Sequence, residues 1–339
     1  MLIHIFILAL SFVVILAGSE LFTNGIEWVG HRLKIAEAAV GSLLAAVGTA
    51  LPETLIPAIA LVTGGSDRSS RSAVGVGAIV GAPLMLSTLA FFVMGVAAIG
   101  FRKRRGRVAL RIHRSDVRRD LTFFVPLFIA LATLGRTGLG LAARRIVVLI
   151  LLATYCVYSV MLLRLKRDPE ASLDHGLYFE RLFRGDPSSP NLSVTLLQVS
   201  AGLLAITVGA IWFVDQIVFF SNHAGLNPGL LSLILSPLAT ELPEKYNSVV
   251  WIRQRKDHLA LANITGAMVF QSCVPTAIGV AFSSWHLSSA ELLACAIGIG
   301  SAILLYINVR DDEIGTPTLM IGGAGYALFI TGLAMLEIF

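Results

Sequence analysis

Charged side chains are scarce in this sequence. They make up 14% of its 339 residues, while apolar residues make up 56%. A soluble domain carries about 25% charged residues to cover its water-facing surface. The composition therefore excludes a soluble enzyme, a nucleic-acid-binding protein and a disulfide scaffold, and it predicts a protein embedded in membrane lipid. The net charge of +5 is typical of basic loops on one side of a bilayer.

Cysteine and enzyme motifs are scarce as well. The three cysteines, Cys156, Cys273 and Cys295, lie in apolar stretches without metal-ligand spacing, which predicts small buried hydrophobic side chains. The sequence contains no H-E-x-x-H, G-x-S-x-G or G-x-x-x-x-G-K motif. We therefore expect neither an enzyme nor a bound cofactor.

Long apolar segments predict an all-α polytopic membrane protein, because a helix needs about 20 mostly apolar residues to cross a bilayer. About ten transmembrane helices are expected, at residues 1–19, 35–63, 72–100, 121–137, 143–163, 193–221, 228–252, 258–282, 288–309 and 315–338. The first lacks a basic start and a cleavage site, so it is interpreted as a span and not as a signal peptide.

Basic residues predict the orientation of these spans. Of the 26 Lys and Arg residues, 20 lie in loops after odd-numbered spans and 5 after even-numbered ones. The positive-inside rule then places the odd loops in the cytoplasm and both termini outside the plasma (inner) membrane. The basic run at 102–107 is interpreted as this topology signal, although such a run also attracts anionic lipid.

The longest connection, residues 164–192, carries charges of both signs. It is interpreted as a solvated cytoplasmic linker, with a short interfacial helix at 178–183 as the alternative. The linker separates a first transmembrane repeat at 1–163 from a second at 193–339.

A short motif recurs in the two halves. The sequence G-T-A-L-P-E at 48–53 returns as A-T-E-L-P-E at 239–244, an offset of 191 residues. The copies lie on spans 2 and 7, which run in opposite directions through the membrane. Two inverted five-helix repeats are therefore expected, with a site at their interface near the bilayer midplane.

Each copy of the motif is suited to binding a cation. Pro52 and Pro243 should break their helices and free backbone carbonyls to line a cavity. Thr49 and Thr240 each stand three residues before the proline and add a hydroxyl. Carbonyl, hydroxyl and carboxylate oxygens are the ligands that Ca²⁺ takes in proteins.

The carboxylates of the motif carry the strongest functional signal. A charged side chain at the bilayer centre costs about 2.5–3.5 kcal/mol, yet Glu53, Glu241 and Glu244 all lie within predicted spans. For Glu241 an i,i+4 pair with Lys245 is a structural explanation. For Glu53 and Glu244 we favour a functional role as ligands of a metal cation.

The motifs resemble those of the cation/Ca²⁺ exchanger superfamily, of the sodium/calcium exchanger type. Its inverted repeats carry G-T-S-L-P-E-like motifs, each followed on the next helix by a G-N-x-x-G-S-N-x-x-N-like motif. Residues 37–41 with 48–53 look like the first motif, and residues 262–271 and, more faintly, 77–86 look like follow-on motifs. The resemblance implies a secondary active antiporter that exchanges Ca²⁺ or another cation for Na⁺ or H⁺ by alternating access between Glu53 and Glu244.

The resemblance also implies an ion-binding set. It places the metal-binding glutamates and the oxygen donors of the family on these positions: Glu53, Glu244, Thr49, Thr240, Asn263 and Gln271. Glu241, where the family has serine, adds a carboxylate. The inorganic cations are expected as transported substrates, and nucleic acid is not expected as a partner.

Departures from the family pattern leave alternatives open. Ala50, Ala82 and Leu86 stand where the first repeat of the family has oxygen-bearing side chains, so fewer bound ions are expected. A non-transporting scaffold or sensor with a degenerate ion site is the alternative function, and a membrane-embedded enzyme with two acid–base glutamates ranks last. Lys245 is either a tethered cation in place of a sodium ion or, as we favour, the structural partner of Glu241.

One further polar residue is a candidate modulator. Asp215 on span 6 is placed by the 191-residue offset on Asn24 of span 1. A position facing a cavity and a position near the outer interface are equally compatible with this spacing.

Overall fold

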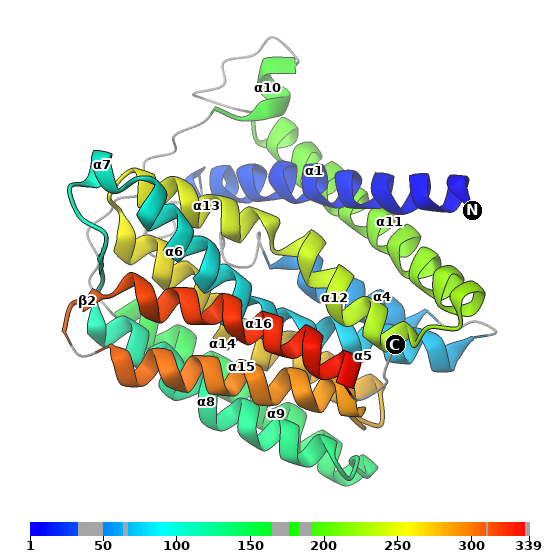
Figure 1. The fold of residues 1–339 in the computed structure, drawn as a ribbon. Coiled ribbons are helices and arrows are strands. Elements are labelled where there is room, and N and C mark those ends of the chain that lie inside the picture. Colours follow the sequence, from blue (N-terminus) through cyan, green and yellow to red (C-terminus); the bar gives the residue numbers. More distant parts are fainter. Residues whose placement is uncertain (33–49, 64–66, 165–175, 183–190, 310, 336–339) are drawn as a thin grey trace.

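The computed structural model describes residues 1–32, 50–63, 67–164, 176–182, 191–309 and 311–335. These residues form an elongated bundle of helices (Figure 1), as the sequence predicts. Gly48 and Thr49, the first two residues of the first copy of the repeated motif, lie outside the described residues, whereas residues 50–53 are described.

The elements of the first half begin with two helices that flank the undescribed segment. The order is α1 (Leu2–Arg32), α4 (Leu51–Val62), α5 (Arg68–Met85), a π-helical turn η2 (Leu86–Ala90), α6 (Phe91–Gly100), α7 (Arg102–Arg105), β1 (Leu110–Arg111), α8 (Arg114–Gly135) and α9 (Leu141–Arg164). Helices α5, η2 and α6 together form one continuous helical segment, Arg68–Gly100.

The second half begins after the connecting segment, which contains α10 (Tyr178–Leu182). It consists of α11 (Leu192–Ala224), α12 (Pro228–Thr240), α13 (Leu242–Arg253), α14 (Asp257–Phe282), α15 (Ser289–Asn308), β2 (Glu313–Ile314) and α16 (Thr316–Met335).

The helices identify an integral membrane protein, but their number differs from the ten spans expected. Seven helices among the described residues are long and apolar enough to cross a membrane, and α4 and α12 are shorter apolar helices. Predicted span 228–252 is divided between α12 and α13, and only residues 50–63 of span 35–63 are described. The count of ten therefore stays a prediction.

Contacts at one end of the bundle join loops that the sequence places on the same side. At the left end in Figure 1, β1 pairs with β2 in antiparallel register, with Leu110 opposite Ile314. The buried carboxylate of Asp257, at the start of α14, accepts a hydrogen bond from Arg105 at 2.5 Å. These contacts connect the loops that follow predicted spans 3, 7 and 9.

Contacts at the opposite end join two other loops. The backbone N–H of Leu139 donates to the carbonyl of Ser284 at 3.0 Å, which connects the loops that follow predicted spans 4 and 8. Helix α1 begins and α16 ends at this end of the bundle (Figure 1). The alternation of loops between two ends agrees with the pattern read from the basic residues.

Two connections differ from the expectations. The pairing of β1 with β2 was not anticipated, because strands of two residues have no periodic signal. The linker is also not a purely solvated segment where it is described: α10 is helical, Tyr178 donates its hydroxyl to Glu20 of α1 at 2.6 Å, and the Gln198 side chain of α11 accepts from the Phe179 N–H at 2.9 Å.

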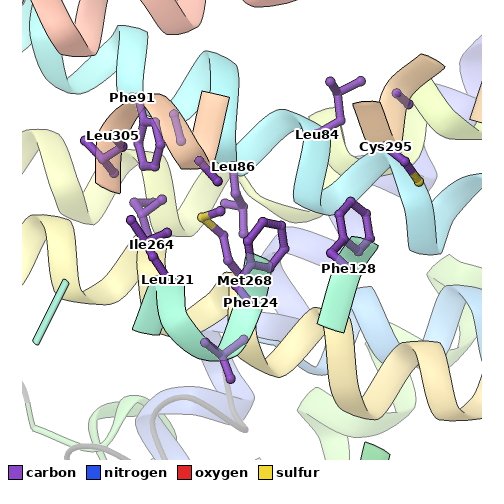
Figure 2. Packing of buried hydrophobic residues seen from close by; sticks show 14 of the residues in the cluster. Leu84, Leu86, Phe91, Leu121, Phe124, Phe128, Ile264, Met268, Cys295 and Leu305 are labelled. Carbon is purple, nitrogen blue, oxygen red and sulfur yellow. The ribbon is translucent and has the colours of Figure 1, made fainter. Parts of the chain in front are cut away.

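The hydrophobic core lies where η2, α8 and α14 meet. Figure 2 shows Leu86, Phe124 and Met268 packed against one another, and all three are buried. Cys273 and Cys295 are buried in the same cluster, as predicted, whereas Cys156 on α9 is exposed. The prediction was wrong for Cys156 because an apolar stretch does not distinguish a core-facing from a lipid-facing side chain.

Glycines permit two close helix crossings, as small residues do in membrane bundles. A Cβ added to Gly81 of α5 would lie 2.1 Å from the carbonyl oxygen of Leu233 on α12. Helices α1 and α11 cross in the same manner: a Cβ on Gly18 would lie 2.8 Å from the Ile206 nitrogen, and one on Gly209 would lie 2.8 Å from Ile15. Gly18 and Gly209 are the pair related by the 191-residue offset.

Candidate ion-binding site

The second copy of the repeated motif interrupts a helix, as its proline predicts, and the described part of the first copy lies at the start of α4. Glu241 separates α12 from α13 with φ −89° and ψ 6°, and Ala50 precedes α4 with φ −88° and ψ 5°. These two residues are equivalent at the 191-residue offset. Pro243 has no N–H for the carbonyl of Ala239, so this carbonyl loses its helical partner. Ala50 and Glu241 therefore have the same backbone conformation at equivalent positions of the two copies.

Each copy of the motif places one carboxylate in the first turn of the helix that follows. Glu53 lies in the first turn of α4 and Glu244 in the first turn of α13, and they are 5% and 2% exposed. The first N–H groups of a helix and its macrodipole stabilise negative charge at this position. Local helix geometry thus offsets part of the cost of burying these two carboxylates.

Glu53 lies at the centre of a buried acidic cluster. Glu244 and Glu241 are close enough to interact electrostatically with it, and the Thr240 side chain is beside it. Neither carboxylate oxygen of Glu53 has a hydrogen-bond partner among the residues that the structure describes. Leaving a buried polar group unsatisfied is costly, so an arrangement of this kind calls for a cation or proton.

A basic residue balances one of the three acids. The Lys245 ammonium lies 2.9 Å from Glu241 Oε2, on the next turn of the chain, and Glu241 is fully buried. The Gln271 side chain on α14 is close to Glu241 and is 2% exposed, and its Oε1 has no hydrogen-bond partner within the described ranges. The i,i+4 pair anticipated from the sequence is therefore formed.

The other candidates occupy different places. Asn263 on α14 is half-buried, and its Nδ2 lies 3.4 Å from the backbone oxygen of Glu244, at the edge of the cluster. Asp215 does not join the cluster. Its carboxylate forms an ion pair with Arg71 at the start of α5. Asp215 therefore lies near a loop, which agrees better with the interface position than with the cavity-facing position that the sequence left equally open.

Two of the altered family positions, Ala82 and Leu86, are buried, and Leu86 is part of the hydrophobic core (Figure 2). The sequence analysis did not anticipate the π-helical turn that begins at Leu86, in which the buried hydroxyls of Ser87 and Thr88 donate to the carbonyl of Leu84. Such turns are frequent at functional sites, and the nearby Pro83 was the available signal.

The cluster offers carboxylate, hydroxyl and amide oxygens, which are hard ligands for Na⁺ or Ca²⁺. Across the described part of the chain, no group of three or more His, Cys, Asp and Glu side chains is arranged to hold a metal ion. Any cation that binds here therefore needs the hydroxyl and amide oxygens in addition to the acids. The chemistry available is reversible cation binding and proton exchange.

Known proteins with similar sequences or folds are exchangers or membrane proteins. The chain is 22% identical over 326 residues to the uncharacterized membrane protein MJ0091 of Methanocaldococcus jannaschii, covering 96% of each chain. Its fold is similar to the H⁺/Ca²⁺ exchanger CAX, with a TM-score of 0.76, 17% identity and coverage of 98% of this chain and 82% of that one. It is also similar to the sodium-calcium exchanger NCX_Mj, with a TM-score of 0.61, 20% identity and coverage of 97% and 98%.

The sodium/calcium exchanger protein family matches residues 3–164 and 194–336, which is most of the chain. This family and both structural neighbours are exchangers, not enzymes. The match spans both halves of the chain and omits the connecting segment between them. The protein is therefore an integral membrane protein that belongs to the sodium/calcium exchanger family.

Proposed function

We propose that the protein is a secondary active antiporter that exchanges Ca²⁺, or another cation, for Na⁺ or H⁺. The substrate cation binds between Glu53 and Glu244, and the two halves of the chain expose this site alternately to each side of the membrane. The observation that carries the proposal is the buried Glu53 carboxylate, which lacks a hydrogen-bond partner among the described residues and lies beside Glu244.

The charges of the cluster suggest how many cations the site binds at one time. Lys245 offsets Glu241, so Glu53 and Glu244 supply two net negative charges. Two charges are balanced by one divalent cation or by two monovalent cations. We therefore propose an electroneutral exchange of one Ca²⁺ for two Na⁺ or two H⁺.

The surrounding architecture in this proposal is a pair of inverted repeats, 1–163 and 193–339, with Thr49, Thr240, Asn263 and Gln271 as further oxygen donors. The matching backbone at Ala50 and Glu241 supports the repeat. The arrangement of loops at two ends of the bundle supports a topology in the plasma membrane with both termini outside and the basic loops inside.

A non-transporting scaffold or sensor is the second candidate. The observation that favours it is Leu86, which occupies the hydrophobic core where the family has an oxygen-bearing side chain. A scaffold of this kind would retain the fold without moving a cation.

The test is uptake of radioactive Ca²⁺ into proteoliposomes under an imposed Na⁺ gradient and then under a pH gradient. Gradient-driven uptake is expected in the wild type and should be lost in Glu53→Gln. The control is Glu20→Gln, which removes an exposed carboxylate on α1 and should leave uptake unchanged. Size-exclusion chromatography verifies that each variant is folded.

Two results would contradict the proposal. Wild-type uptake in Glu53→Gln would exclude this carboxylate as a ligand. A folded wild type that takes up no Ca²⁺ under either gradient, and no other cation in the same assay, would favour the scaffold.

A further inference from the structure

A basic cavity lies at the end of the bundle where β1 and β2 pair. Its volume is about 570 Å³, and it is lined by residues of α7, the segment that follows it, the α13–α14 loop and the start of α14: Arg105, Gly106, Arg107, Arg111, Arg255 and His258. No acidic residue is among those that line it. This cavity is separate from the acidic cluster and plays no part in the proposed transport step.

A buried carboxylate holds the guanidinium groups in place. Asp257 Oδ2 accepts from Arg105 at 2.5 Å, from Arg107 at 3.0 Å and from the backbone N–H of Arg111 at 3.0 Å. Asp257 and the Arg105 side chain are both fully buried. Because one carboxylate restrains two of four arginines, the lining keeps an excess of positive charge in a fixed geometry.

Two guanidinium donors beside this cavity lack acceptors among the described residues. The Nε atoms of Arg105 and Arg107 are buried and have no hydrogen-bond partner among the described residues. The Arg111 side chain is 72% exposed, and its Nε lies 3.7 Å from Glu313 Oε1. Buried guanidinium donors without acceptors are an unfavourable arrangement unless a ligand supplies the oxygens.

A helix end adds to the positive potential. Helix α14 begins at this cavity, whereas the start of α8 lines the neighbouring cavity, and the rings of His113 and His258 lie 4.9 Å apart. Helix N-termini favour anions, and phosphate groups in particular. The neighbouring cavity, of about 420 Å³, includes Asp312 and Glu313 in its lining and is therefore less suited to an anion.

We propose that the basic cavity binds a phosphoryl group. Planar guanidinium groups match the geometry of phosphate oxygens and bind them in pairs of hydrogen bonds. The group is supplied either by the monoester headgroup of an anionic lipid or by free phosphate, since the cavity lies where the helices end. A bound phosphoryl group connects the α7–β1 segment of the first half with α14 of the second.

Binding of free phosphate is tested by calorimetric titration of the purified full-length protein with inorganic phosphate, against chloride at equal ionic strength. The test variant is Arg111→Gln with Arg255→Gln, because both side chains lie outside the buried Arg105–Asp257 pair and the fold should be retained. The matched control is Arg102→Gln with Lys103→Gln, which removes the same charge from exposed positions outside the lining.

Binding of a lipid headgroup is tested by thermal unfolding in phosphatidylcholine bicelles with and without phosphatidic acid. An affinity for inorganic phosphate that falls about tenfold or more in the test variant alone assigns the site to free phosphate. A phosphatidic-acid-dependent rise in melting temperature that is lost in the test variant alone assigns it to the lipid. No response to either ligand, or equal responses in the test and control variants, would overturn the proposal. A single Arg107→Gln variant repeats the comparison should the double variant not fold.

Discussion

Removing the ammonium of Lys245 should strongly destabilise the protein. The Lys245 Nζ–Glu241 Oε2 distance is 2.9 Å, and both side chains are buried. At an effective dielectric constant of about 20, two unit charges at this distance attract by about 6 kcal/mol. Desolvation offsets part of this attraction, and breaking one side of a buried pair costs about 3–5 kcal/mol. Lys245→Met should therefore lower the free energy of unfolding by that amount.

The double variant Lys245→Met with Glu241→Gln isolates the pair. It removes both charges together, so most of the lost stability should return. Chemical denaturation in detergent of the wild type, Lys245→Met, Glu241→Gln and the double variant gives the coupling energy of the pair. Because the net charge at Glu53 and Glu244 is unchanged, Ca²⁺ uptake by the double variant should stay electroneutral and should not respond to an imposed membrane potential.

Two results would refute this reasoning. A Lys245→Met variant as stable as the wild type would show that the pair contributes little. Full recovery of Lys245→Met by added Na⁺, with uptake that now responds to membrane potential, would show that Glu241 binds a transported ion and that Lys245 stands in for one.

Two further predictions concern packing and the loop between α4 and α5. Gly81→Ala should destabilise by about 1–3 kcal/mol, because its Cβ would lie 2.1 Å from the carbonyl oxygen of Leu233; Gly100→Ala, with open space around it, is the control in thermal unfolding. The pKa of Asp67 is lowered from its usual 3.8 because Ser70 donates hydrogen bonds to it, so the stability it contributes is present above that value and lost as pH falls through the lowered pKa. Asp67→Asn should therefore make the melting temperature depend less on pH at the acidic end of a pH series.

The sequence predicted the helix break and the acidic cluster because both follow from local chemistry. Pro243 cannot donate to the preceding turn, and the structure ends α12 at Thr240. Glu241 and Lys245 are four residues apart on one chain segment, so their pairing needs no knowledge of tertiary structure. The family resemblance was carried by the same short motif, and the match over both halves confirmed it.

Contacts between distant segments could not be predicted in this way. Asp215 and Arg71 are 144 residues apart, and nothing in either local sequence indicates the ion pair. The same holds for Arg105 and Asp257, whose pairing creates the basic cavity. The exposure of Cys156 depends on which face of α9 meets lipid, and a helix that is apolar on all sides has no periodic pattern to show it.

The losses in the first half bear on the proposed ion capacity. Leu86 packs with Phe124 and Met268 in the hydrophobic core, and its side chain offers no oxygen ligand. In the proposal the first half then supplies Glu53 and the Thr49 oxygen, while the second supplies Glu244 and the other neutral oxygens. A site with one strong ligand group from each half balances two positive charges, and the pairing of Glu241 with Lys245 prevents a third. The lost ligands and the added ion pair thus lead to the same expectation, an exchanger that binds one divalent cation or two monovalent ones in turn.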